Sequence, residues 1–377
     1  MAYILDEKGK AIVKLVKDFM ENEVAPYVVE YDRSGEYPEF LYKKACDLGL
    51  NKLEIPKEVG GYGLDYITIA ACVEEMAKVD AGFSTGLNST SLALKPILLY
   101  ANPELKKWAC EYVVNGGTAA FALTEPAAGS DAGAVRTRAV KVGDEYIING
   151  TKCFITGAAH SQVMSVIAST DPTKGSKGLS AFVVPSDTPG VSFGKHEDKM
   201  GIRLSETSEI IFEDVHIPAS NLLGKEGEGF KVAMGTLNLA RPIVGAAAVG
   251  IAQRALEEAV KYSKERIAFG KPIAKQQGVS FKIAEMAARC EGARQAVAHA
   301  FRLYEAGLPY LTEAAISKYL GGQAAVQNAL DAIQIFGGYG YIRDYPVEKL
   351  LRDSKIFTIF EGTDEVQKIT IAGQLLR

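Results

Sequence analysis

Paired cysteines are missing from this 377-residue chain. It holds five cysteines, an odd number, which are widely spaced and form no C-x-x-C motif: Cys46, Cys72, Cys110, Cys153 and Cys290. This pattern argues against a disulfide framework and against a structural zinc site. The four histidines are also far apart in the sequence. We therefore predict reduced thiols and no bound metal.

Long runs of basic residues and long runs of apolar residues are missing too. The net charge is −4 and basic residues are scattered, so nucleic acid is not an expected partner. The most apolar stretch, Pro242–Gln253, is shorter than the about 20 residues that a membrane span needs. Residues 1–10 become charged before an apolar segment of useful length appears, unlike a secretion signal. We expect a cytoplasmic protein without a membrane span.

The glycine motifs of nucleotide-binding loops are absent as well. Neither Gly227–Gly229 nor Phe336–Gly340 completes G-x-G-x-x-G, and G-x-x-x-x-G-K-[ST] does not occur. One hydrolase motif is present, since Gly82–Gly86 matches G-x-S-x-G. That motif requires a strained turn after a buried strand, whereas the preceding residues 74–78 have a helical pattern. An α/β-hydrolase therefore stays a distant alternative.

The patterns that are present divide the chain into three parts. Hydrophobic residues make up 47% and charged residues 23%, which is ordinary for a globular protein, and the length suits two or three subdomains. Helical periodicity gives way to short β-rich runs and then returns, which predicts a mostly α protein with a central β domain. The expected boundaries are 1–117, 118–226 and 227–377. The expected helices are 4–24, 40–48, 66–79, 92–100, 106–114, 230–266, 278–305, 311–336 and 364–376, and the expected, antiparallel strands are 119–123, 135–142, 146–148, 153–156, 163–168, 179–184 and 209–212.

Glu361 is the carboxylate with the most suggestive setting. It follows the apolar run Ile356–Phe360 and precedes Gly362. Apolar surroundings raise the pKa of a carboxyl group toward neutrality, as a general base requires, and a glycine lets a ligand approach the backbone. The alternative is a surface residue near the start of the last helix, whose dipole favours negative charge. Asp364 and Gln367 have the spacing of a capping box for that helix.

Four segments carry a resemblance to a known family. They are Phe121–Asp131 (FALTEPAAGSD), Asn149–Thr156 (NGTKCFIT), Arg266–Lys271 (RIAFGK), and Gln334–Gly340 (QIFGGYG) followed by Glu361–Thr363 (EGT). In this order the chain resembles the acyl-CoA dehydrogenase family over nearly its whole length. The resemblance implies an N-terminal helical domain, a middle β-barrel domain and a C-terminal four-helix bundle. It also implies a homotetramer built as a dimer of dimers.

The resemblance further implies an FAD site and an acyl-CoA site. Glu361 falls on the family's catalytic base, whereas Ala240, at the position that serves as base in a minority of relatives, cannot accept a proton. Phe154 stands where many members have Trp. Residues implied for FAD are Phe121, Leu123, Thr124, Gly129, Ser130, Phe154, Ile155, Thr156, Thr363 and Glu365, with Arg266, Phe269, Gln277, Gln334, Ile335, Gly337 and Gly338 reaching the FAD of a neighbouring subunit. Residues implied for the substrate are Ser130, Asn238, Arg241 and Gly362.

The implied reaction is α,β-dehydrogenation of an acyl-CoA thioester to the 2-enoyl-CoA. Glu361 takes the α-proton, hydride goes from the β-carbon to flavin N5, and electrons pass to an electron-transferring flavoprotein. The stretch Phe83–Ser91 contains no Arg, which disfavours a dicarboxylic substrate. Linear short-chain or medium-chain acyl-CoA thioesters are the first substrate candidates. Branched, cyclic or aryl-substituted acyl-CoA thioesters stay open as alternatives. The reverse reaction, enoyl-CoA reduction, is the first alternative, and a non-enzymatic scaffold is the second.

Overall fold

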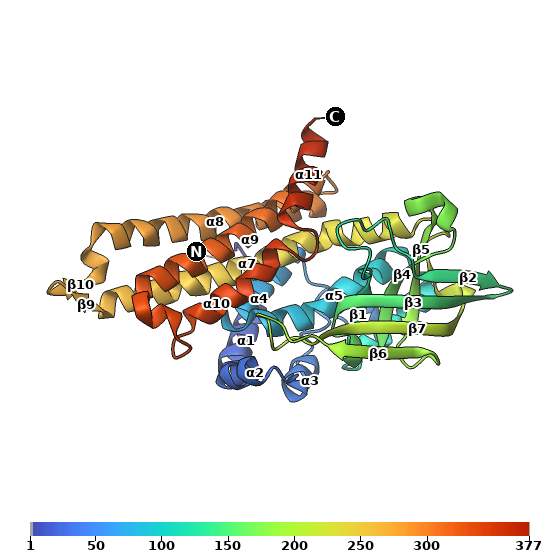
Figure 1. Cartoon of the computed structure of the whole chain (residues 1–377), viewed down its shortest axis with the longest axis horizontal. Coiled ribbons are helices and arrows are strands. Elements are labelled where there is room, and N and C mark those ends of the chain that lie inside the picture. The colour runs from blue at the N-terminus through green and yellow to red at the C-terminus, as the bar shows by residue number, and fades with distance from the viewer. Residues whose placement is uncertain (1–2, 377) are drawn as a thin grey trace.

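The computed structural model describes residues 3–376 and shows helices, then a sheet, then helices (Figure 1). The N-terminal helices are amphipathic or buried, and the apolar spacing predicted all of them except the helix over residues 28–34. Asp6, Asp65, Asp80 and Asn102 each accept a hydrogen bond from the first turn of a helix and so fix where it begins. The main helices of this region are α1 (Glu7–Phe19), α2 (Val28–Ser34), α3 (Glu39–Asp47), α4 (Tyr66–Val79), α5 (Ala81–Tyr100) and α6 (Pro103–Val114).

Helix α5 overturns the hydrolase alternative. It begins at Ala81, so Gly82–Gly86 lies inside a helix and does not follow a buried strand. Ser84 is fully buried and its hydroxyl donates to the carbonyl oxygen of Val73. A nucleophile in this position could not reach a substrate. The sequence prediction placed the start of this helix too late, at residue 92, because its glycines and serines are typical of a turn.

The middle region is one eight-stranded sheet, in the order β6-β7-β3-β2-β4-β5-β8 with β1 paired to β4. Most neighbours are antiparallel, as expected, but β1 and β4 pair in parallel. Two predicted strands, 146–148 and 153–156, form the single strand β3, and neither β6 nor β8 was predicted. The strands are β1 (Ala119–Ala122), β2 (Arg138–Val142), β3 (Glu145–Thr156), β4 (Val163–Ser169), β5 (Leu179–Pro185), β6 (Val191–His196), β7 (Thr207–Pro218) and β8 (Leu222–Leu223).

The C-terminal region contains three long helices that pack side by side, with α9 packed extensively against α7 and α8 (Figure 1). The short strands β9 (Ile267–Ala268) and β10 (Lys271–Pro272) form a hairpin at the end of the molecule opposite the sheet. The helices are α7 (Gly229–Glu265), α8 (Gln277–Glu305), α9 (Leu311–Phe336), α10 (Val347–Ser354) and α11 (Asp364–Leu375). Of these, α10 was not predicted.

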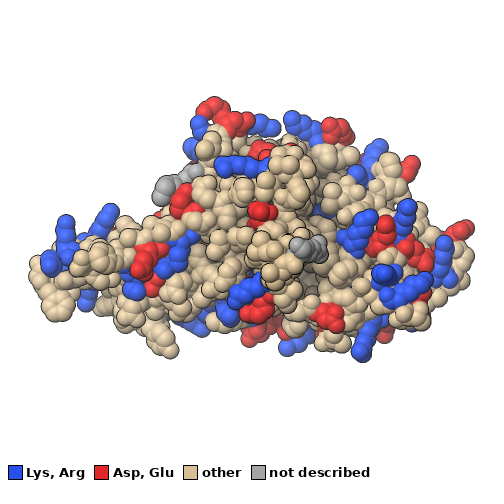
Figure 2. All heavy atoms as spheres, turned by 90° about the horizontal axis from the view of Figure 1, so that it is seen from above, with Lys and Arg blue, Asp and Glu red and all other residues tan. Residues whose placement is uncertain are grey.

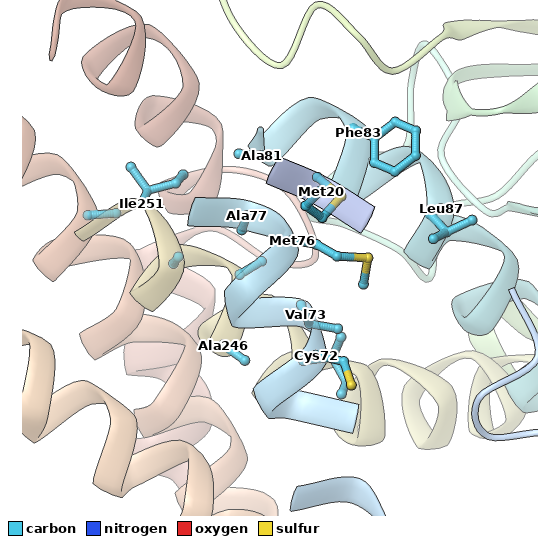
Figure 3. Packing of buried hydrophobic residues seen from close by; sticks show 14 of the residues in the cluster. Met20, Cys72, Val73, Met76, Ala77, Ala81, Phe83, Leu87, Ala246 and Ile251 are labelled. Atoms are coloured by element: carbon cyan, nitrogen blue, oxygen red, sulfur yellow. The ribbon is translucent and has the colours of Figure 1, made fainter. Parts of the chain in front are cut away.

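The largest core cluster joins the N-terminal helices to α7. Figure 3 shows Met76 and Ala77 of α4 close to Met20 and to Phe83 of α5, with Ile251 of α7 on the other side. Small residues along α7 let these helices approach closely. Within the described residues, α7 is the one helix long and apolar enough to cross a membrane, but 83% of its most apolar window is buried in the protein. Such burial is typical of a core helix.

Charged side chains lie mainly on the surface. Figure 2 shows Lys and Arg interspersed with Asp and Glu on the face seen from above. Mixed charge of this kind favours solubility without creating a single-sign field.

Candidate active site

Glu361 lies in a tight turn between α10 and α11. Its φ is +52°, a left-handed conformation that is uncommon for a residue with a side chain, and the next residue, Gly362, has φ +93°. The side chain is half-buried, and its Oε2 atom is buried without a hydrogen-bond partner in the described structure. A strained backbone that presents a bare carboxylate oxygen is typical of a functional position.

Three side chains hold this turn. Gln367 is fully buried and its Nε2 donates to the carbonyl oxygens of Gly362 at 2.8 Å and Glu361 at 3.3 Å. Lys318 of α9, also fully buried, donates to the same Gly362 carbonyl at 2.8 Å. Thr363 caps α11, since its hydroxyl accepts the N–H of Val366. The predicted capping box is therefore wrong: Thr363 is the cap, and Gln367 instead binds the preceding turn.

Burial sets the proton affinity of Glu361. Loss of contact with water raises its pKa to about 7, although the positive charges of Lys95, Lys318 and Arg241 act in the opposite direction. The carboxylate and carboxylic acid forms are therefore both accessible near neutral pH, which suits a general base. Arg241 of α7 is buried, and its Nη1 donates to Asn238 Oδ1 at 2.7 Å, while its Nε has no partner in the described residues.

A buried ion pair joins the loop after β1 to strand β3. Lys152 donates to the Leu123 carbonyl at 2.9 Å and to Glu125 Oε1 at 2.8 Å. The Glu125 carboxylate also accepts the N–H groups of Arg136 and Thr137. The Cys153 N–H donates to the carbonyl oxygen of Thr124 at 3.0 Å. These contacts bring together the segments 121–125 and 152–156, which are far apart in the sequence.

Phe154 lies where β3 is irregular. The register with β7 shifts between Lys152 and Ile155, and Phe154 has φ +57°. The bulge turns its ring outward, so that 65% of the side chain is exposed although the strand is mostly buried. Ile155 is buried within the sheet, whereas Thr156 is half-buried. An exposed aromatic face beside β1 offers a flat surface on which a ring can lie.

The other predicted FAD residues lie elsewhere. A surface hollow of about 450 Å³ lies at the hairpin end of the bundle, far from the sheet in Figure 1. Gln277 begins α8 just after the hairpin, Gln334 lies in the last turn of α9, and Phe269 at the hairpin tip is 92% exposed. The hollow is lined by Tyr262, Arg266, Ile273, Ile335, Phe336, Gly337, Gly338, Tyr339 and Ile342.

The structure therefore divides the predicted site residues into two groups. The first group comes from the β region, the start of α11 and the first third of α7, and the second group lies at the hairpin end of the bundle. Phe121, Leu123, Thr124, Gly129, Ser130, Phe154, Ile155 and Thr156 belong to the β region. Glu361, Gly362, Thr363 and Glu365 lie at the start of α11, and Asn238 and Arg241 lie in the first third of α7. Arg266, Phe269, Gln277, Gln334, Ile335, Gly337 and Gly338 lie at the opposite end.

Sequence reasoning missed several buried polar residues near Glu361. Lys95, Lys318 and Gln367 contribute to its surroundings, and all three are at least 98% buried. Lysines inside an otherwise apolar helical pattern were the available signal, because a buried ammonium group requires a partner. Their partners come from distant segments, so the sequence alone could not identify them.

Three family models match almost the entire chain. The N-terminal domain of acyl-CoA dehydrogenase matches residues 6–117, the middle domain matches 120–215, and the C-terminal domain matches 227–376. The chain belongs to the acyl-CoA dehydrogenase family.

Relatives of this acyl-CoA dehydrogenase family member align over nearly full length. An acyl-CoA dehydrogenase of Bacillus subtilis (strain 168) is 45% identical, with 96% of each chain covered. An acryloyl-CoA reductase (NADH) of Anaerotignum propionicum is also 45% identical, over 100% of this chain and 96% of the relative. These relatives identify the protein as an oxidoreductase that acts on CH–CH donors.

Solved structures agree with this family assignment. Butyryl-CoA dehydrogenase from Megasphaera elsdenii superposes with a TM-score of 0.97 at 43% identity, covering 100% of both chains. A chain in the structure of the electron transferring flavoprotein of Acidaminococcus fermentans gives the same TM-score of 0.97 at 44% identity, again over 100% of both. The predicted fold is therefore confirmed.

Acyl-CoA dehydrogenases depend on FAD, and the residues of this chain fit that cofactor. The exposed ring of Phe154 suits a flavin face, and a side chain added at Gly129, Gly337 or Gly338 would meet only open space. Arg266, beside those last two glycines in the hollow, supplies positive charge for a phosphate. An aromatic face, an open stretch of backbone and a cation are each suited to one part of a flavin dinucleotide.

Proposed function

We propose that Glu361 is the catalytic base in the oxidation of an acyl-CoA thioester to its 2-enoyl-CoA. The observation that carries this proposal is a half-buried carboxylate with a pKa of about 7 and a buried oxygen that no donor contacts. Such a group can accept a proton at neutral pH without first breaking a hydrogen bond. The strained turn, held by Gln367 and Lys318, fixes the direction in which the carboxylate points.

The remaining residues position the substrate and exclude water. Bound FAD would supply the acceptor for the hydride that leaves the β-carbon. The backbone N–H of Glu361 is the proposed donor to the thioester carbonyl, which acidifies the α-proton. Arg241, Asn238, Ser130 and Gly362 are proposed to contact the acyl-CoA. Desolvation raises the pKa of Glu361, and the nearby cations Lys318 and Arg241, which are themselves buried, keep it from rising further.

We propose that one FAD site is completed by a second copy of the chain. The two groups of predicted FAD residues lie at opposite ends of the molecule, so one cofactor cannot touch both within a single chain. The exposed aromatic side chain of Phe269 would be covered in such an assembly. A homotetramer, built as a dimer of dimers, satisfies this requirement.

Electrons are proposed to pass to an electron-transferring flavoprotein in the cytoplasm. A structural match named for such a flavoprotein supports this partner. The name of the 45% identical acryloyl-CoA reductase supports a second candidate function, enoyl-CoA reduction with electron-transferring flavoprotein subunits. The same active-site groups serve both directions, because a base that removes an α-proton returns one in reverse.

Anaerobic titration of the purified protein with a panel of acyl-CoA thioesters tests the proposed function. The visible absorption of the flavin should bleach with at least one saturated acyl-CoA. Enoyl-CoA added to the chemically reduced enzyme should restore the absorption, because the same groups serve both directions. A protein that binds flavin but responds to no thioester in either experiment would contradict the proposal.

A further inference from the structure

A buried ion pair lies where three separate segments of the β region meet. The Lys152 and Glu125 side chains are 0% and 5% exposed, and Lys152 Nζ lies 2.8 Å from Glu125 Oε1. The attraction within such a pair does little more than offset the cost of taking two charges out of water, so the pair adds little to stability. Its contacts with the backbone indicate a more local role.

The pair fastens both ends of the loop that joins β1 to β2. At the start of this loop, Lys152 donates to the carbonyl oxygen of Leu123 at 2.9 Å. Near its end, the Glu125 carboxylate accepts the N–H groups of Arg136 at 2.7 Å and Thr137 at 2.9 Å. One cation and one anion therefore connect both ends of the loop to β3.

The Lys152 contact also fixes the direction of one peptide group. No peptide bond among the described residues is cis, and in a trans peptide the C=O of Leu123 and the N–H of Thr124 point in opposite directions. Because Lys152 holds the carbonyl oxygen, the Thr124 N–H points away from the ion pair. Within residues 3–376 that N–H has no backbone acceptor, and Thr124 is only half-buried. The pair thus presents a free hydrogen-bond donor.

The same pair stands at the bulge that exposes the Phe154 ring. The register of β3 with β7 shifts between Lys152 and Ile155, and Phe154 lies within this shift. The Cys153 N–H donates to the Thr124 carbonyl at 3.0 Å and so ties the bulge to the loop. The free donor and the exposed ring are therefore carried by two segments that are joined at neighbouring residues.

A flat ring and a fixed N–H group suit the chemistry of a flavin. The flavin ring has an aromatic face, and its edge carries oxygen and nitrogen atoms that accept hydrogen bonds. Negative charge develops on the ring when it is reduced, so a fixed donor at the edge stabilises the reduced form more than the oxidised form. The position of the donor therefore affects both the affinity for FAD and the reduction potential of the flavin.

We propose that Lys152 and Glu125 are positioning residues for FAD, which hold the Thr124 N–H as a donor to the flavin edge and hold the Phe154 ring for the flavin face. Both ionic groups act through the backbone that they anchor, since the Lys152 side chain is fully buried. This inference rests on the proposed function, which places FAD beside β1 and β3.

A double variant tests the role of the pair. Glu125→Gln with Lys152→Met removes both charges together, so that no buried ion is left without a counterion. The Leu123 carbonyl loses its donor, and the peptide group is no longer fixed. We expect the dissociation constant of oxidised FAD to rise at least about tenfold. The affinity for reduced FAD should fall at least about tenfold further, which lowers the two-electron potential by about 30 mV or more.

A second buried pair supplies the matched control. Glu74 of α4 and Arg294 of α8 are 8% and 2% exposed, with Oε1 and Nη2 2.7 Å apart, and they join two helices outside the sheet. Glu74→Gln with Arg294→Met should change the affinity for either form of FAD by less than about threefold. A folded Glu125→Gln, Lys152→Met variant with an unchanged potential would overturn the inference, even if FAD bound more weakly, because a general loosening of the site would explain that result.

Hydrogen exchange on the wild-type protein provides a test that does not depend on a variant. The Thr124 amide should exchange at least about tenfold more slowly with FAD bound than after reversible removal of FAD, because the flavin then accepts its hydrogen bond. The Cys153 amide, which donates to the Thr124 carbonyl, should be protected in both states. Equal exchange of the Thr124 amide in the two states would overturn the inference, and this result decides if the double variant does not fold.

The inference and the proposed function can fail separately. If FAD is held as described but no acyl-CoA reduces the flavin, the proposed function alone is contradicted. If an acyl-CoA reduces the flavin but the double variant keeps the potential of the wild type, the inference alone is contradicted.

Discussion

At Glu361 the backbone and the side chain are both held in unfavourable states. A left-handed conformation at a non-glycine residue costs about 1–3 kcal/mol, and removing a carboxylate from water costs more. The hydrogen bonds from Gln367 and Lys318 to the turn offset part of these costs. The apolar run before Glu361 correctly suggested a raised pKa, but the identity of the residues that hold the turn depends on tertiary structure.

The raised pKa of Glu361 predicts a pH dependence of flavin reduction. Only the carboxylate form accepts a proton, and the pKa of about 7 places half of the free enzyme in that form near neutrality. The kcat/KM for flavin reduction should therefore fall about tenfold per pH unit well below pH 7 and level off above it. Anaerobic rapid mixing from pH 5.5 to 8.5 measures the profile. A flat profile across this range would contradict the assignment.

At the scale of elements, α9 and α11 clamp the catalytic turn between them. Lys318 comes from α9 and Gln367 from α11, and both donate to the Gly362 carbonyl at 2.8 Å. Asp364 lies 3.6 Å from Lys318 and accepts a hydrogen bond from Gln323 of α9. The Gly362 carbonyl group thus connects α9 with α11.

Gln367→Leu should loosen this clamp. It removes both hydrogen bonds to the turn at nearly constant volume, so we expect a loss of about 1–3 kcal/mol in stability and a tenfold or larger fall in the rate of flavin reduction. Flavin content should stay near that of the wild type. Thermal unfolding and rapid mixing measure the two effects, with Gln374→Leu, at a partly exposed residue near the end of α11, as control. An unchanged reduction rate would show that Gln367 does not position Glu361.

The elements that the sequence failed to predict depend on distant contacts. Helix α10 is rich in charge, yet Lys349 lies 2.6 Å from buried Asp80, and Arg352 lies 2.7 Å from Asp32. These ion pairs join residues about 270 to 320 positions apart, so no local pattern could show them. By contrast, α4 and the long bundle helices have strong apolar periodicity and were predicted to within a few residues. The domain boundaries at 117/118 and 226/227 stay predictions.

For the whole molecule, the separation of the two groups of predicted FAD residues is the main feature. The β region lies at one end of the long helices, and the hollow around Arg266 lies at their other end. The sequence motifs indicated both groups, but only the fold shows the distance between them. Cofactor retention and assembly should therefore depend on each other.

Arg266→Ala should weaken the retention of FAD and the assembly together. The guanidinium group lies exposed in the hollow, 5.7 Å from the ring centre of Tyr339, and is the proposed partner of a phosphate from the neighbouring subunit's cofactor. Flavin content after gel filtration and the elution volume are the measurements. Lys264→Ala, another exposed cation at the end of α7, is the control and should change neither. Full flavin occupancy at an unchanged size in Arg266→Ala would contradict the proposal.

The central claim is that the carboxylate of Glu361 removes the α-proton, and Glu361→Gln tests it most directly. Glutamine has almost the same shape but cannot accept a proton at neutral pH. Removing the buried charge should leave the fold, the flavin and acyl-CoA binding intact, and should not lower the stability at pH 7, where the carboxylate is unfavourable. Rapid anaerobic mixing with the best acyl-CoA should show flavin reduction slowed by about 10²–10⁴-fold or more. Bleaching at close to the wild-type rate would mean that another group is the base.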